Sequence, residues 1–272
     1  LNEAVTYGHR TPEVYSMLAD LYYTGQRLED AILALRNLLD SPEITHFDVN
    51  FAIRLLREME VNREEIFNSS RVIKNLDADD SIEVAETLQL HREDLNICIT
   101  ILERILTDKK VQDEFIVNRA KNTIILALVG AGRYQEAMDM ICKPRPSPEN
   151  LTEYDAFNYG MAEWGLTGQL PQDMMKRVLE IHNKMQDSRS SNYIQCIAFA
   201  FWALGDAEKA REMVNQARQK IIREKGPTFS AWQYLIVSEE RFLKDLREFE
   251  EMLDGKDISP GFLMKNLIKK HD

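Results

Sequence analysis

The amino-acid sequence predicts an all-α protein, a right-handed α-solenoid of about six to seven helical hairpins. The first observation is a glycine-centred pattern at Gly132, Gly168 and Gly205, whose period of about 36 residues is typical of stacked helical hairpins. Each glycine follows a large side chain four positions upstream and precedes an apolar or aromatic residue two positions downstream. The second observation is composition: 44% hydrophobic and 29% charged residues, with only 11 Gly and 8 Pro, indicate a folded, helix-rich chain.

The first hairpin is predicted over residues 12–40. Thr11 and Pro12 favour helix entry, because Thr caps helix N-termini and Pro fits the first helical position. Gly25 and Gln26 then break the helix at about residue 24. A second helix over 28–40 follows, with an apolar face at helical spacing formed by Ala31, Leu35 and Leu38.

Three more hairpins are expected in the N-terminal part, residues 1–143. They span 46–75, 81–107 and 111–143. The first of these has no glycine at its turn, so we interpret it as a degenerate repeat. Between it and the next lies the acidic link 77–80, whose carboxylates are expected to cap the helix that follows.

Residues 144–149 form a stiff Pro-rich segment that is incompatible with a helix, predicted to be a bend or a boundary between two sub-arrays. The C-terminal part, residues 150–272, is expected to contain hairpins over 151–186, 190–224 and 228–253. A terminal helix over 259–270 and a strongly charged last unit would shield the end of the array.

The spacing resembles that of the tetratricopeptide repeat family. Hairpin 190–224 matches that pattern best, whereas hairpin 151–186 departs from it with Met161 and Asp173 where small residues are expected. The resemblance implies that the first helix of each hairpin lines a concave surface. The positions that carry the match in hairpin 190–224 are Ile194, Ile197, Ala198, Phe201, Gly205, Ala207, Ala210, Val214 and Ala217.

We expect the concave surface of the hairpins between 111 and 224 to bind a peptide. Amide side chains there would hold backbone groups of the peptide, and aromatic side chains would supply buried area. An alternative is that Tyr159, Phe199 and Trp202 pack between hairpins as core. The predicted partner-binding residues are Arg119, Asn122, Asn158, Tyr159, Asn192, Gln195, Phe199 and Trp202.

The function predicted on this basis is that of a non-enzymatic scaffold for protein–protein interactions. An alternative follows from a similarity to the pentatricopeptide repeats, which bind single-stranded RNA. An amide ten residues before each turn glycine, at Asn122, Asn158 and Gln195, is similar to the base-reading position of that family. The second reading position of that family has no regular Asp or Asn here, and the alternative stays open.

Charge narrows the class of partner. A formal net charge of −11 argues against a general phosphate-binding surface and favours a neutral or basic partner protein. One basic stretch runs against this trend, and it is either a contact for phosphate or an acidic partner or a solvated helix face. It consists of Lys209, Arg211, Arg218, Lys220, Arg223 and Lys225.

No catalytic residue, metal site or cofactor is predicted, because the five histidines are isolated and no Cys pair has metal-ligand spacing. No apolar stretch is long enough for a membrane span. We expect an intracellular, cytoplasmic protein. The first residue is Leu rather than Met, so a leader could lie upstream, and a mitochondrial location stays open.

Overall fold

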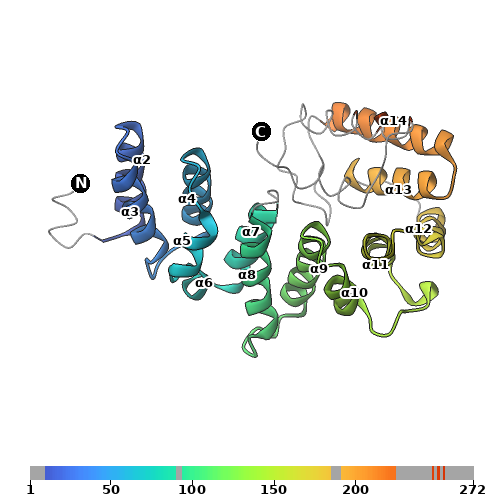
Figure 1. Cartoon of the computed structure of the whole chain (residues 1–272), viewed down its shortest axis with the longest axis horizontal. Helices are drawn as coiled ribbons and strands as arrows, with labels where there is room; N and C mark the ends of the chain where they lie inside the picture. Colours follow the sequence, from blue (N-terminus) through green and yellow to red (C-terminus); the bar gives the residue numbers. More distant parts are fainter. Residues whose placement is uncertain are drawn as a thin grey trace. The chain divides into compact units, whose positions relative to one another are not determined.

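The computed structural model of the chain is helical throughout the part that it describes. These residues are 10–89, 94–184 and 191–224, with Arg247, Glu250, Glu251 and Asp254, although the side chains of 191–195 and 220–224 are outside the description. Within these ranges every regular element is a helix, so the predicted all-α class is confirmed (Figure 1). The expected hairpin 228–253 and the terminal helix 259–270 lie almost wholly outside the described residues.

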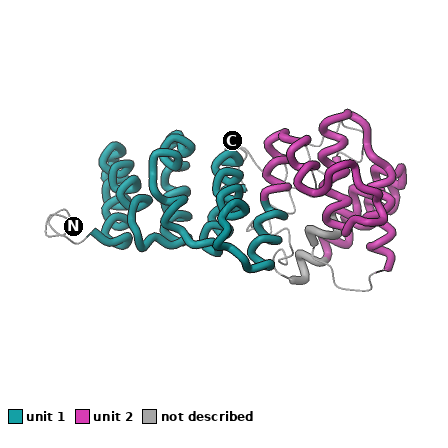
Figure 2. Tube along the Cα trace, turned by 90° about the horizontal axis from the view of Figure 1, so that it is seen from below, with its two compact units in different colours: residues 1–89, 93–123 teal, residues 90–92, 124–272 magenta. Residues whose placement is uncertain are grey.

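The chain divides into two compact units (Figure 2). Unit 1 comprises residues 1–89 and 93–123, and unit 2 comprises residues 90–92 and 124–272. The division therefore falls within a helix and not in the Pro-rich segment 144–149.

Helices that follow one another in unit 1 are in contact: α2 with α3, α3 with α4, α4 with α7, and α7 with α8. The small residues Ala19 and Ala31 are fully buried where α2 approaches α3. The predicted second helix of hairpin 46–75 is split into two shorter helices. The elements are α2 (Pro12–Thr24), α3 (Leu28–Leu39), α4 (His46–Glu58), α5 (Arg63–Ser69), α6 (Val72–Asn75), α7 (Ala78–Gln89), α8 (Leu95–Thr107) and α9 (Glu114–Gly130), which continues into unit 2.

Unit 2 shows the same sequential packing, from α10 against α11 to α13 against α14. The small residues Ala198 and Ala210 are again fully buried. The predicted hairpins 151–186 and 190–224 are present as helix pairs. The elements are α10 (Tyr134–Ile141), the 3-10 turn η2 (Pro148–Asn150), α11 (Glu153–Thr167), α12 (Gln172–Lys184), α13 (Ser191–Ala203) and α14 (Ala207–Glu224).

Four of the inter-helix turns have the same backbone geometry. The second residue after the helix is left-handed in each, with φ of 77° at Gly132, 87° at Gly205, 56° at Gln26 and 55° at Glu60. The next residue donates its N–H to the carbonyl five positions back, as Arg133 does to Leu128. The left-handed residue itself donates its N–H to the carbonyl three positions back, as Gly132 does to Val129. These two hydrogen bonds form the Schellman motif, whose left-handed position glycine adopts without steric cost. Hairpin 46–75 therefore has the same turn as the other hairpins, although a glutamate stands where they have glycine or glutamine.

Two arginines hold the Pro-rich segment against the helices of unit 2. Arg145 pairs with Glu163 of α11 at 2.8 Å and with Asp173 of α12 at 2.9 Å. Arg177 of α12 donates to the backbone carbonyls of Glu149 and Leu151. These contacts hold the segment against α11 and α12 inside one unit.

Candidate functional site

Three of the predicted partner-binding side chains are buried. Asn158 is 1% exposed, Tyr159 2% and Phe199 0%, and the amide of Asn158 donates to the backbone carbonyl of Tyr154 at 2.9 Å. The reason is that α11 and α13 are covered on every side over residues 156–162 and 197–200. None of the three side chains offers a surface to a partner in this structure, so they are not part of the site developed below.

An aromatic cluster explains this burial. The ring of Phe199 on α13 lies 5.9 Å from Phe157 and 5.7 Å from Trp164, both on α11, and 5.4 Å from Trp202. Such ring pairs stabilise packing beyond the area that they bury. Aromatic residues that were expected to bind a peptide therefore pack α11 against α13. This arrangement corresponds to the alternative in which these residues are part of the core.

Arg119 links α9 to α7 within unit 1. Its guanidinium makes a two-pronged contact with Glu86, at 2.8 and 2.6 Å, and also reaches Glu83 at 2.6 Å. Burial raises the pKa of Glu86, and the hydrogen bond and charge of Arg119 offset this only in part. The positive charge of Arg119, which was predicted to contact a partner, is thus neutralised by two glutamates of α7.

The structure describes the side chains of only two of the remaining predicted partner-binding residues. Asn122 on α9 and Trp202 on α13 are half-buried. Asn192 and Gln195 lie on α13, but their side chains are outside the described part of the structure. The structure therefore brings together Phe199 and Trp202, and of the two amides whose side chains it describes, Asn158 is buried and Asn122 is half-buried.

An exposed aromatic surface occurs instead on α4 in unit 1. Phe47 is 74% exposed, Phe51 and Asn50 are half-buried, and Arg54 and Glu58 are exposed. These five residues, called here the Phe47 surface, follow helical spacing along one side of α4. The opposite side holds the core residues Val49, Ala52, Ile53 and Leu56.

Each phenylalanine ring has another side chain packed beside it. The ring of His46 lies 3.9 Å from that of Phe47, and the guanidinium carbon of Arg54 lies 5.6 Å from the centre of the Phe51 ring. Arg54 therefore stacks over the aromatic face in the manner of a cation–π pair.

Two carboxylates lie at the Phe47 surface: Asp80 on the neighbouring helix α7, and Glu58 on α4 itself. His46 Nδ1 contacts Asp80 of α7. On the side of α2, desolvation and then the Glu58 carboxylate raise the pKa of Tyr23. Each of these carboxylates contacts a side chain of the fold, and their negative charge favours a positively charged ligand.

Asn50 supplies a polar group to this surface. Its Oδ1 atom is buried and has no hydrogen-bond partner among the described residues. A buried acceptor without a partner is uncommon in folded proteins, because its desolvation is not compensated. The Oδ1 atom of Asn50 is therefore an unsatisfied acceptor inside the fold.

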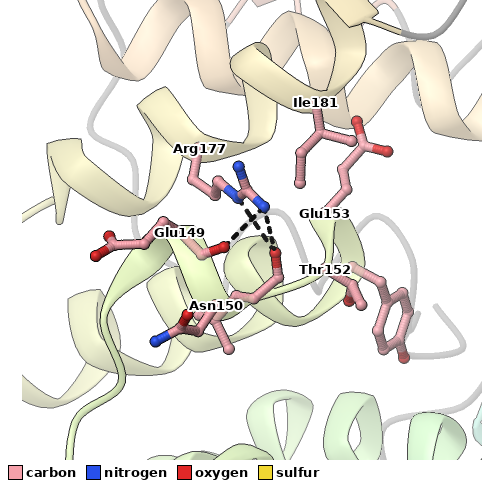
Figure 3. A pocket seen from close by; sticks show the side chains of 8 residues that line it. Glu149, Asn150, Thr152, Glu153, Arg177 and Ile181 are labelled. Carbon is pink, nitrogen blue, oxygen red and sulfur yellow. Dashed lines mark hydrogen bonds between the residues drawn. The ribbon is translucent and has the colours of Figure 1, made fainter.

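A hollow of about 520 Å³ in unit 2 has a different character (Figure 3). It is lined by residues 149–154 with Arg177 and Ile181. Figure 3 shows the guanidinium of Arg177 directed at the backbone carbonyls of Glu149 and Leu151, which it holds at 3.0 and 3.2 Å. Its charged group serves the fold of this segment, so we do not assign a ligand to the hollow.

Two further types of site were searched for in the described part of the chain. No three His, Cys, Asp or Glu side chains converge there as the ligands of a metal ion. No helix in those ranges combines the length and the apolar character needed to cross a bilayer.

Sequence reasoning missed the Phe47 surface, although a signal for it exists. On α4 the apolar pair Phe47 and Phe51 lies opposite the core stripe that includes Val49 and Ile53. A helix with one buried face needs one apolar stripe, so a second stripe marks a surface for another contact.

Comparison with known proteins gives no relative: no protein-family model, no curated protein and no solved structure matches this chain.

Proposed function

We propose that the chain is a right-handed α-solenoid of tetratricopeptide-like hairpins that serves as a non-enzymatic scaffold and binds a peptide of a partner protein. The recurrence of one turn geometry at Gln26, Glu60, Gly132 and Gly205 supports a repeated hairpin. Sequential contacts between neighbouring helices in each unit are what stacked hairpins require.

The observation that carries the peptide-binding proposal is the exposure of Phe47, 74%, beside the half-exposed Phe51. An aromatic ring in water is a source of binding free energy, since burying one Phe side chain contributes about 1.5–3 kcal/mol. Aromatic residues on one exposed helix stripe are the kind of anchor that dominates peptide interfaces.

Asn50 and the two carboxylates at the Phe47 surface add specificity to this anchor. Asn50 is half-buried beside the two phenylalanines, and an amide at such a position can hydrogen-bond a peptide backbone. The net charge of −11 and the carboxylates of Glu58 and Asp80 favour a neutral or basic peptide over an acidic one. The proposed ligand is therefore a peptide with an apolar anchor and basic flanks.

No observation favours the alternative of single-stranded RNA binding. That alternative depends on a register of exposed amides at Asn122, Asn158 and Gln195. The amide of Asn158 is buried and donates to Tyr154 within its own helix. A stacking platform with a basic groove, which RNA would require, is not among the described surfaces.

The test uses peptides enriched from a random display library on the wild-type chain. Their dissociation constants are measured by fluorescence anisotropy for wild type, Phe47→Ser and Asn50→Ala. We expect Phe47→Ser to weaken binding at least about tenfold, in line with the loss of one buried aromatic anchor.

The matched control is Leu33→Ser on α3. Leu33 is 58% exposed and lies on a different helix of the same unit, so its replacement removes similar apolar area. Equal losses for Phe47→Ser and Leu33→Ser, or no enriched peptide at all, would contradict the proposal. Circular dichroism checks that each variant stays folded.

A further inference from the structure

A second exposed phenylalanine lies in unit 1, two hairpins along the chain from the Phe47 surface. Phe115 is 71% exposed and is the second residue of α9, as Phe47 is the second residue of α4. Phe115 belongs to unit 1, as do α4 and α7. The two most exposed large apolar side chains of the described residues thus have equivalent places in two hairpins of one unit.

The helix between them, α7, is joined to both of their helices at a regular step along the chain. Arg119 of α9 reaches back 36 positions to Glu83, and a backbone carbonyl of α9 accepts a hydrogen bond from Gln89, 34 positions earlier. These two contacts follow the same order along both helices, so α7 and α9 are parallel. A step of 34 also joins His46 of α4 to Asp80 of α7. Asp80 and Glu83, three residues apart on one side of α7, are called here the acidic stripe.

The same contacts place the two phenylalanines on either side of the acidic stripe. His46 meets the stripe from α4, and its ring lies 3.9 Å from that of Phe47. Arg119 meets the stripe from α9, one helical turn after Phe115 and on the same side of that helix. Phe47 and Phe115 therefore flank the acidic stripe and are both accessible to one ligand that crosses it.

Helix α7 gives the surface between the two phenylalanines a negative charge. The helix carries Asp79, Asp80, Glu83 and Glu86 and contains no lysine or arginine. Asp79 is exposed, and the side chain of Glu83 stays 45% exposed although it contacts Arg119. A ligand that reaches both phenylalanines must pass over these carboxylates, so a cationic residue between its two anchors is favoured.

We propose that Phe115 is a second anchor of the peptide site. The ligand is then an extended basic segment of a partner protein that crosses α4, α7 and α9 and places one apolar side chain against each phenylalanine. This inference rests on the proposed function of the Phe47 surface, and it adds the length, the direction and the central charge of the ligand.

The spacing of the helices sets the length of this segment. Packed helix axes lie about 8–10 Å apart, so the two steps from α4 to α9 cover roughly 16–20 Å. An extended chain advances about 3.3 Å per residue, so about five or six residues lead from one anchor to the other. Asn118 is exposed one turn after Phe115, and its amide can bond backbone groups that an extended segment leaves free.

The probes are fluorescein-labelled peptides in which two leucines stand two to nine positions apart, with serines and one central lysine between them. Their binding to the full chain is measured by anisotropy. We expect affinity to be greatest when the leucines are about five or six positions apart. For that peptide Phe115→Ser should weaken binding at least about fivefold, as the loss of an aromatic anchor does. The matched control is Leu166→Ser in unit 2, which removes a side chain that is 51% exposed and should leave binding unchanged.

A charge exchange tests the position of the peptide over α7. Replacing the central lysine of the peptide by glutamate should weaken binding, and Asp79→Lys should reverse the preference between the two peptides. Glu64→Lys makes the same charge change at an exposed residue of α5 and should not reverse it. Circular dichroism checks that each variant stays folded.

Failure of this inference is distinct from failure of the proposed function. Binding that Phe47→Ser weakens and Phe115→Ser leaves unchanged, or affinity that does not depend on the spacing of the leucines, would overturn the second anchor alone. Absence of binding by every peptide would overturn both. Self-association of the chain that Phe115→Ser abolishes, measured by sedimentation, would identify a second copy as the occupant and would also overturn the inference.

Discussion

The ring of Tyr134 occupies the space that a side chain at position 165 would fill. A Cβ atom added to Gly165 on α11 would lie 2.4 Å from Cζ of Tyr134 on α10, a distance that non-bonded carbon atoms do not tolerate. Tyr134 is the aromatic residue two positions after the turn glycine Gly132. The repeated sequence pattern thus has a packing partner on the next hairpin, and the pairing joins α10 to α11.

We expect Gly165→Ala to lower the free energy of unfolding by about 1–3 kcal/mol, because overpacking a close helix contact displaces the ring. Urea denaturation measures the change. The double variant Gly165→Ala plus Tyr134→Ala should lose less than the sum of the two single changes, since removing the ring relieves the clash. Strict additivity would show that the contact is not formed.

The left-handed turn residues make a second expectation. Glu60→Gly should raise the free energy of unfolding by up to about 1 kcal/mol. A left-handed non-glycine residue costs about 1–2 kcal/mol, and glycine removes this cost but loses more conformational entropy on folding, which cancels part of the gain. Gly132→Ala should lower it by about 1 kcal/mol, although the added Cβ meets no atom within 4 Å. Melting temperatures that shift the same way for both variants would contradict this turn geometry.

Asp94 is the centre of a buried ionic cluster in unit 1. The carboxylate is 1% exposed and receives Arg57 of α4 and Arg63 of α5, each at 2.6 Å. Asp94→Asn should destabilise the chain by about 3–5 kcal/mol, because it removes the buried charge that pairs with two largely buried guanidinium groups. The control is Glu136→Gln at the exposed pair with Arg133, which should cost less than about 1 kcal/mol. Similar losses in chemical denaturation would refute the distinction.

Thiol reactivity should distinguish the three cysteines. Burial raises the pKa of the Cys98 and Cys196 thiols well above the ordinary value, whereas Cys142 is exposed. Because the thiolate is the reactive form, only Cys142 should react rapidly with a disulfide reagent at pH 8 in the native protein. Denaturant should expose the other two. Mass spectrometry of the labelled sites is the measurement, and rapid native labelling of Cys98 would contradict the packing of α8.

The pH dependence of stability should reflect Glu86. Burial raises its folded-state pKa above the ordinary value of 4.5, so the protonated form is favoured in the folded protein. The stability that comes from this group is complete below the unfolded-state pKa and is lost as pH rises through the folded-state pKa. Glu86→Gln should therefore gain stability relative to wild type at pH 7 and not at pH 4. The same gain at both values would exclude this cause.

Much of the helical layout was predictable because it depends on local interactions. Apolar spacing and turn chemistry act within a few residues, and they predicted α2 and α3 to within a few residues of their observed ends. The turn at Glu60 was missed because a left-handed glutamate is identical in sequence to any other glutamate. Its conformation is imposed by the helices on either side.

The candidate site was less predictable because accessibility is not a local property. The sequence by itself determined that Asn158 and Phe199 lie on first helices of hairpins. Only the tertiary structure decided that α11 and α13 cover these two residues while Phe47 stays in solvent. It also decided that Arg211 and Arg218 meet Asp254 and Glu250. The physical reason is that burial and ion pairing depend on neighbours far along the chain, which the period of a single helix does not encode.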